Sequence, residues 1–131
     1  MPLQRIDVVA GRSEEQRRAI GDAVQRALVE TIGVPTEDRF QLVTEHPRAG
    51  FLCTPAYLGI RYHDPVLIQL TISAGRSTEQ KQRLYQRLAE LLEAAHVLRS
   101  DVVVNLVEVA REDWSFGNGL AQYVPDHREG R

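Results

Sequence analysis

The second residue of the chain, Pro2, is the first whose position suggests chemistry. Once Met1 is removed, the nitrogen of Pro2 becomes a secondary amine in a rigid ring. An exposed α-amino group titrates near pH ~8, and burial without a counter-charge lowers that pKa. Such an amine can accept and return a proton near neutral pH, as general acid–base catalysis requires. While Met1 is present, the same nitrogen is a tertiary amide and has no basic lone pair.

Pro2 alone is weak evidence, because proline often follows methionine in proteins that make no use of it. Arg76 is a possible companion. A guanidinium group can bind a substrate carboxylate through two parallel hydrogen bonds and polarise an adjacent oxo group. The alternative is that Arg76 is a surface residue at the start of a helix.

Several other function classes are excluded by composition. The 131 residues include 16 basic and 18 acidic side chains, so the net charge of -2 argues against a dedicated nucleic-acid binder. The single cysteine, Cys53, forms no intrachain disulfide, and no apolar run approaches the ~20 residues that span a bilayer. We therefore expect a cytoplasmic protein without metal or cofactor. The four histidines have no metal-ligand spacing; they are His46, His63, His96 and His127.

The elements that must position Pro2 and Arg76 follow from hydrophobic periodicity and from helix start and stop signals. The expected strands are residues 3–9, 39–45, 66–72 and 102–109, and the expected helices begin at Ser13 and Ser77. Residues 47–62 indicate a long loop with room for a short hairpin. Residues 120–124 are expected to form a short final strand, followed by a polar tail.

The two halves of the chain share sequence as well as element order. The segment AGRSEEQ at 10–16 matches AGRSTEQ at 74–80, an offset of 64 residues. We interpret this as an internal duplication. It predicts one α+β domain of two β-α-β halves, about 2–46 and 66–109, with a connecting loop at 47–65 and a tail at 110–131. Side by side, the halves form a four-stranded mixed sheet with two helices on one face. The other face needs a cover, for which oligomerisation is the natural solution.

The duplication also indicates which arginine accompanies Pro2. The residue 64 positions beyond Pro2 is Val66, so the second half lacks an equivalent proline. If the halves pack as a pseudo-dimer, Arg76 faces the Pro2 end and Arg12 faces the proline-free end.

With these features the sequence resembles the tautomerase superfamily, whose members use an amino-terminal proline and consist of β-α-β units. The initial Pro2, the following strand and Gly11-Arg12-Ser13 carry this resemblance. The doubled unit resembles the longer, trimeric branch. Within that branch, Val34-Pro35, Asp38-Arg39 and residues 113–117 (DWSFG) are similar to malonate semialdehyde decarboxylase.

The resemblance implies a role for each matching residue. Pro2, Asp38 and Arg76 are the expected catalytic residues, and Arg76 also binds the substrate carboxylate. A carboxylate at Asp38 would favour protonated Pro2 and raise its pKa; alternatively, Asp38 accepts turn amides after Pro35. Trp114 and Phe116 either wall the substrate pocket or pack in a trimer interface.

One departure shifts the expected activity. The decarboxylase carries two arginines flanking a proline before the second helix, whereas this chain has Ala74-Gly75-Arg76. With one cation fewer, a keto–enol tautomerase of a small 2-oxo or enol carboxylic acid fits better. A decarboxylase-like lyase or hydratase and a non-catalytic trimeric binding protein are the alternatives. The expected partners are the small oxo acid and two further copies of the chain.

Overall fold

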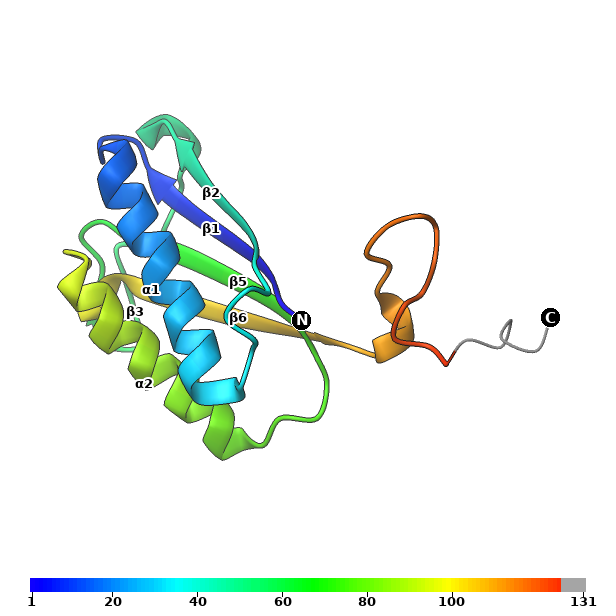
Figure 1. Ribbon diagram of the computed structural model, residues 1–131. Coiled ribbons are helices and arrows are strands. Elements are labelled where there is room, and N and C mark those ends of the chain that lie inside the picture. Colours follow the sequence, from blue (N-terminus) through cyan, green and yellow to red (C-terminus); the bar gives the residue numbers. More distant parts are fainter. Residues whose placement is uncertain (126–131) are drawn as a thin grey trace.

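Two β-α-β units follow one another along the chain. In the computed structural model, which describes residues 1–125, the first consists of β1 (Leu3–Val9), α1 (Glu14–Ile32) and β2 (Phe40–His46). The second consists of β5 (Val66–Ser73), α2 (Thr78–Ala94) and β6 (Val102–Val109). Both helices lie on the same face of one sheet (Figure 1). The expected α+β arrangement is therefore confirmed.

The sheet has four strands in the order β2-β1-β5-β6. β1 is parallel to β2, and β5 is parallel to β6, while the central pair β1 and β5 is antiparallel. In that central pair Leu3 lies opposite Thr71 and Asp7 lies opposite Leu67. Because of this register, the beginning of β1 and the end of β5 meet at the same edge of the sheet. The segment that follows β5, with Arg76, therefore approaches Pro2.

The repeated sequence forms the same cap on each helix. Ser13 accepts a hydrogen bond from the Gln16 amide (3.1 Å), and Ser77 accepts the equivalent bond from Gln80 (3.1 Å). The glutamine side chains in turn accept hydrogen bonds from the backbone amides of the two serines. These capping boxes satisfy amide groups that have no partner inside the helix. α1 ends at Gly33, whose left-handed backbone (φ 72°) favours glycine.

The hydrophobic core lies between the helices and the sheet. Alternate residues of the central strands point into it, including Ile6 and Val8 of β1 and Ile68 and Leu70 of β5. The opposite face of the sheet has no helix, and the register places large apolar side chains on it. Those that are exposed on it are Leu3, Phe40, Leu42 and Leu67. This uncovered sheet face is the one for which the sequence predicts a covering partner.

The connection between the halves contains a 3₁₀ turn, η1 (Arg48–Gly50), and a hairpin of β3 (Ala56–Tyr57) and β4 (Ile60–Arg61). Leu58 and Gly59 at the hairpin tip both have positive φ, as a tight two-residue turn requires. The short hairpin anticipated in this loop is therefore present. The remaining 3₁₀ turns are η2 (Arg99–Asp101) and η3 (Arg111–Asp113).

The predicted strand at 120–124 is wrong. This segment forms turns, with the Leu120 amide bonded to the Gly117 carbonyl and the Val124 amide bonded to the Ala121 carbonyl. Gly117, Asn118 and Gly119 all have positive φ, and this backbone curls the chain instead of extending it along the sheet. After β6 the chain leaves the sheet and projects to one side (Figure 1). The last part of the predicted tail, 126–131, lies outside the described residues.

Candidate active site

A cavity of about 210 Å³ lies beside the chain terminus, where β1 begins. Pro2 is buried and Met1 is half-buried, so the terminal amine is partly removed from water. Arg76 lies on the cavity wall, as the duplication predicts. The full lining comprises Met1, Ser73, Ala74, Arg76, Arg111 and Tyr123.

Backbone carbonyl groups of two elements hold the Arg76 guanidinium in place. It donates one hydrogen bond to the Ser73 carbonyl at the end of β5 (3.1 Å) and another to the Ile32 carbonyl at the end of α1 (3.4 Å). A guanidinium group has five N–H donors, so three remain for a ligand. Arg76 is therefore a preorganised cation.

Burial and nearby charges shift the pKa of the terminal amine. Burial lowers the pKa of the Met1 amine, and Arg76 and Arg111 lower it further, whereas the Asp38 carboxylate raises it; the net shift is downward. Asp38 thus acts in the direction that the sequence suggests, but burial and Arg76 outweigh it at this amine. A lowered pKa increases the fraction of neutral amine, the form that can accept a proton.

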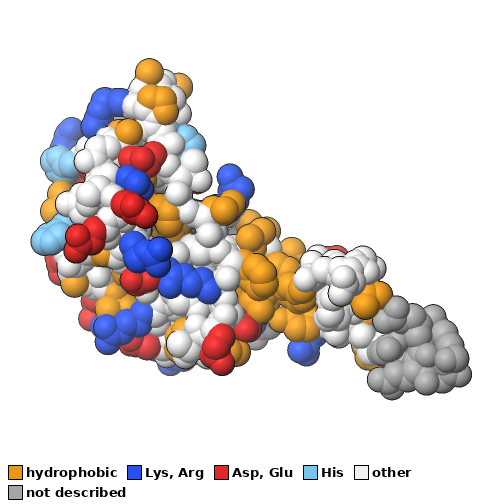
Figure 2. Space-filling model, turned by 45° about the horizontal axis from the view of Figure 1, so that its top comes forward, with side chains coloured by type: hydrophobic (Ala, Val, Ile, Leu, Met, Phe, Trp, Pro, Cys, Tyr) orange, Lys and Arg blue, Asp and Glu red, His pale blue; other side chains and the backbone are white. Residues whose placement is uncertain are grey.

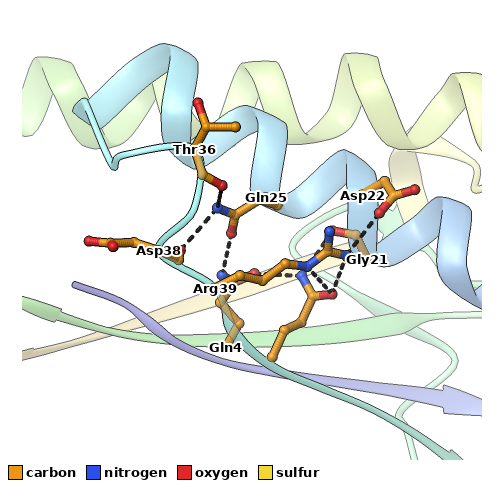
Figure 3. Close-up of polar contacts among 8 residues, drawn as sticks. Gln4, Gly21, Asp22, Gln25, Thr36, Asp38 and Arg39 are labelled. Carbon is orange, nitrogen blue, oxygen red and sulfur yellow. Dashed lines mark hydrogen bonds and ion pairs between the residues drawn. The ribbon is translucent and has the colours of Figure 1, made fainter. Parts of the chain in front are cut away.

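A chain of polar side chains at the sheet–helix boundary fixes the backbone at Asp38. The buried Gln25 side chain donates hydrogen bonds to the carbonyl oxygens of Thr36 (3.3 Å) and Asp38 (3.0 Å). Gln25 accepts a hydrogen bond from Gln4 of β1 (2.7 Å). The Asp38 carboxylate points away from this network (Figure 3). The backbone amide of Asp38 donates a hydrogen bond to the Pro35 carbonyl and closes the turn after Pro35. The Asp38 carboxylate takes no part in this hydrogen bond and is free for other contacts.

Trp114 and Phe116 form an aromatic cluster beside the terminal cavity. Their rings stack with centroids 5.5 Å apart, and Phe116 also stacks on Phe40 of β2 (5.9 Å). The Trp114 indole donates a hydrogen bond to the Ser73 hydroxyl (3.1 Å), and Ser73 lines the terminal cavity. Hydrophobic side chains gather at the base of the projecting C-terminal segment in Figure 2. A second, apolar cavity of about 460 Å³ has Trp114, Phe116 and Leu3 among its lining residues.

Sequence models of two families, each described as tautomerase enzyme, match residues 38–117 and 2–61. The chain belongs to the tautomerase family.

Relatives extend this similarity to nearly the whole chain. The probable tautomerase YrdN of Bacillus subtilis (strain 168) is 35% identical over 125 residues, which are 95% of this chain and 97% of the relative. The crystal structure of FG41 malonate semialdehyde decarboxylase inhibited by 3-bromopropiolate is 45% identical, with a TM-score of 0.87, covering 92% of this chain and 93% of that one. A fused 4-OT symmetric trimer, 24% identical with a TM-score of 0.75 and covering 90% of this chain and 94% of that one, shares the fold.

At the other end of β1 and β5, away from the terminal cavity, the second half of this tautomerase-family chain begins without a chain terminus. Arg12 forms a salt bridge with Asp64 (3.1 Å), two residues before Val66. The buried Asp101 carboxylate accepts hydrogen bonds from the amides of His63 (2.8 Å) and Asp64 (3.1 Å). Asp101 corresponds to Asp38, and Arg12 to Arg76. A connecting chain and its carboxylate therefore occupy the second end, so only the first end has a terminal amine.

The sequence did not single out Arg111 and Tyr123, although both line the terminal cavity. The Arg111 guanidinium lies over the Tyr123 ring, 5.4 Å from its centroid. Both residues lie beyond β6, outside the repeated halves, so the duplication gave no signal for them. Among residues 1–125 there is no group of three or more His, Cys, Asp or Glu side chains that could hold a metal ion. Within the same range, no helix has the length and apolar character to cross a membrane.

Proposed function

We propose that this member of the tautomerase family catalyses keto–enol isomerisation of a small 2-oxo or enol carboxylic acid without a cofactor. The observation that carries the proposal is the cavity at the start of β1, whose wall includes both the chain terminus and Arg76. Removal of Met1 would leave the amine on Pro2, the residue that directly precedes β1.

In the proposed reaction one proton moves between oxygen and carbon by way of the Pro2 nitrogen. The neutral amine removes the proton of the enol hydroxyl, and the electron pair of that O–H bond forms the C=O bond. The electrons of the C=C bond then take the same proton back from the Pro2 nitrogen and form a C–H bond. The amine returns to its neutral form, so the cycle is balanced and can also run in reverse.

Each neighbouring side chain has a defined part in this proposal. Arg76 binds the substrate carboxylate and withdraws electron density from the adjacent oxo group. Asp38 stabilises the protonated Pro2 that forms during the transfer. Trp114 and Phe116 limit access of water, which strengthens the contact between Arg76 and the carboxylate. The Arg12–Asp64 pair supports this role for Arg76, because it is a carboxylate bound by the corresponding arginine of the other half.

The similarity to a malonate semialdehyde decarboxylase favours a lyase or hydratase as the second candidate. The same three residues would serve: Arg76 would hold the carboxylate and Pro2 would supply a proton. Ala74 stands where the decarboxylase resemblance calls for an arginine, and this absence favours tautomerisation as the main activity.

We further propose a homotrimer in the cytoplasm. The uncovered sheet face supports association, because it carries several exposed apolar side chains, and one of the structures with this fold is described as a symmetric trimer. In such an assembly both faces of the sheet would be covered, and its exposed apolar side chains would be removed from water.

The proposed function is tested by Pro2→Ala in protein whose intact mass shows that Met1 has been removed. Tautomerisation of an enolpyruvate-type substrate should fall by at least about a hundredfold, the contribution typical of a general acid–base group. The control is Pro47→Ala, because Pro47 is exposed, follows β2 and does not line the terminal cavity, so this variant should keep the wild-type rate. Wild-type rates in Pro2→Ala would overturn the mechanism, and wild-type protein active only in decarboxylation would favour the second candidate.

A further inference from the structure

Three glutamine side chains, here called the glutamine network, connect β2, β1 and α1 to the loop that carries Asp38. Gln41 of β2 donates a hydrogen bond to Gln4 of β1 (2.6 Å), and Gln4 donates one to Gln25 of α1 (2.7 Å). Gln25 then donates to the carbonyl oxygen of Asp38 (3.0 Å; Figure 3). Gln4 is fully buried and Gln25 is 6% exposed, so these bonds are shielded from water.

Both ends of the glutamine network fix the direction of its hydrogen bonds. At the outer end, the Arg39 guanidinium donates to the side-chain oxygen of Gln41 (2.8 Å) and is itself held by Asp22 (2.9 Å). A guanidinium group can only donate, and the Asp38 carbonyl at the inner end can only accept. Each amide in between must therefore accept on its outer side and donate on its inner side. This orders the Gln25 side chain with its NH₂ group toward the loop.

The equivalent positions in the second half of the chain are apolar. The residues 64 positions beyond Gln4 and Gln25 are Ile68 and Ala89, and Val104 pairs with Ile68 as Gln41 pairs with Gln4. Ile68 belongs to the core and Val104 packs against it. Apolar side chains of suitable shape are about as stabilising as a buried hydrogen-bonded pair, and they leave no polar group to satisfy. Stability alone therefore does not account for the glutamine network.

The backbone of α1 is also adapted to the glutamine network. Gly21 lies within the helix, and a side-chain carbon there would collide with the Gln41 side-chain oxygen. The Gly21 carbonyl accepts a second hydrogen bond from the Gln41 amide (2.8 Å). Glycine inside a helix lowers its stability relative to alanine. The first half thus has a weaker helix at the point where the glutamine network needs space.

The two equivalent aspartates are held in different ways. In the second half, the Asp101 carboxylate itself accepts hydrogen bonds from the backbone amides of residues 63–64. In the first half, Gln25 holds the Asp38 backbone, and among residues 1–125 the Asp38 carboxylate forms no hydrogen bond or ion pair. This carboxylate is near enough to the terminus to raise the pKa of the Met1 amine. The loop is therefore fixed while the charge of Asp38 stays available to the amine.

We propose that Gln25 is a positioning residue, which holds the loop so that the Asp38 carboxylate stays beside the amine of Pro2. This inference rests on the proposed function for the role of Pro2. Gln25 touches neither the amine nor the substrate cavity and acts only through Asp38. The charged groups that act on the terminal amine are Arg76, Arg111 and Asp38, and of these Gln25 holds only the last.

The test compares Gln25→Leu with the wild type in Met1-free protein. Loss of both donors releases the loop, so the pKa of the Pro2 amine in nitrogen NMR should fall, as expected for Asp38→Asn. The value of kcat/KM should fall about tenfold, because a displaced group near the reacting atoms costs up to about a hundredfold. The matched control is Ala89→Gly, at the equivalent position of α2. It weakens a helix without contact with Asp38 and should leave both values unchanged.

Two further variants separate positioning from a general loss of structure. In an Asp38→Asn background, Gln25→Leu should change the Pro2 pKa no further, because the charge that it positions is gone. Arg39→Met removes the exposed outer donor and should lower this pKa by less than Gln25→Leu does. Loss of the Arg39 cation would by itself raise the pKa, so a fall reports the glutamine network.

Three results would overturn the proposal. The first is an unchanged Pro2 pKa in Gln25→Leu, and the second is an effect of Gln25→Leu that adds fully to that of Asp38→Asn. If Gln25→Leu does not fold, an unchanged pKa in Arg39→Met decides against it. A failure of the proposed function would appear differently, as the expected changes of pKa together with no Pro2-dependent tautomerisation.

Discussion

The terminal amine lies between opposing electrostatic influences. Burial is the main influence that disfavours its protonated form, followed by Arg76 and, more weakly, Arg111, whereas Asp38 favours that form. The net downward shift of its pKa increases the fraction of neutral amine, the form that can act as a base. The same surroundings would act on Pro2 once Met1 is removed, because Pro2 is the next residue of the chain and directly precedes β1. The amine and its three charged neighbours are thus the unit on which catalysis would depend.

Removing one charge at a time should move the pKa of this amine in opposite directions. Arg76→Gln removes a cation and should raise the pKa, whereas Asp38→Asn removes an anion and should lower it. In pH profiles of kcat/KM, the limb on the acidic side should move to higher pH in Arg76→Gln and to lower pH in Asp38→Asn. The amine signal in pH-dependent nitrogen NMR should follow the same order. Shifts in the same direction for both variants would contradict this account.

At the level of single residues, sequence reasoning identified Pro2, Arg76, Asp38, Trp114 and Phe116 as the candidate site. The structure places Arg76 and the terminus on one cavity, while the catalytic roles themselves stay predictions. Arg111 and Tyr123 were missed because neither has a counterpart in the repeat. Their proximity arises from the turn at η3 and from aromatic packing around Phe116, neither of which a linear pattern reveals.

The elements that hold the site were largely predictable. Capping boxes at Ser13 and Ser77 and the glycine at position 33 gave the bounds of the helices. Near-continuous apolar runs gave β5 and β6. The strand expected at 120–124 failed because alternation of residue types indicates a strand only where a neighbouring strand edge can pair with it. Positive φ angles at residues 117–119 instead curl the segment into turns.

The two helix caps provide a matched pair of substitutions. Ser13→Ala and Ser77→Ala should each lower the free energy of unfolding by about 1 kcal/mol, because each removes an equivalent hydrogen bond to a helix amide. Ser77 directly follows Arg76, so Ser77→Ala should also raise KM for the oxo acid, whereas Ser13→Ala should leave KM unchanged. Urea denaturation and steady-state kinetics measure the two effects. An equal change of KM in both variants would show that the cap does not position Arg76.

The whole molecule is asymmetric in function although its halves repeat in structure. At one end of β1 and β5 there is a free terminus, and at the other the chain passes through Asp64, which neutralises Arg12. This difference accounts for one proposed site in a chain of two similar halves. The division of the chain stays a prediction: one domain over residues 1–131, with halves at about 2–46 and 66–109. The duplication predicted that Arg76 faces the Pro2 end if the halves pack as a pseudo-dimer, but it did not give the register of β1 against β5.

The uncovered sheet face makes a prediction about association. Leu42 of β2 is 50% exposed, and Leu67 of β5 is 37% exposed on the same face, so burying them against other copies would be favourable. Leu42→Glu places a charge on that face and should convert the proposed trimer to smaller species in sedimentation velocity. Because Leu42 does not belong to the core cluster, the fold of the single chain should survive. The far-ultraviolet circular dichroism spectrum should therefore resemble that of the wild type.

Leu98→Glu is the matched control, because Leu98 is 55% exposed and lies between α2 and η2, outside the sheet. It should leave the sedimentation coefficient unchanged. An unchanged coefficient in Leu42→Glu would show that association, if it occurs, uses another surface. The aromatic cluster links this prediction to the site, since Phe40 contributes both to the uncovered face and to the stack with Phe116. Loss of association in Leu42→Glu should therefore be accompanied by weaker substrate binding, measured as a higher KM.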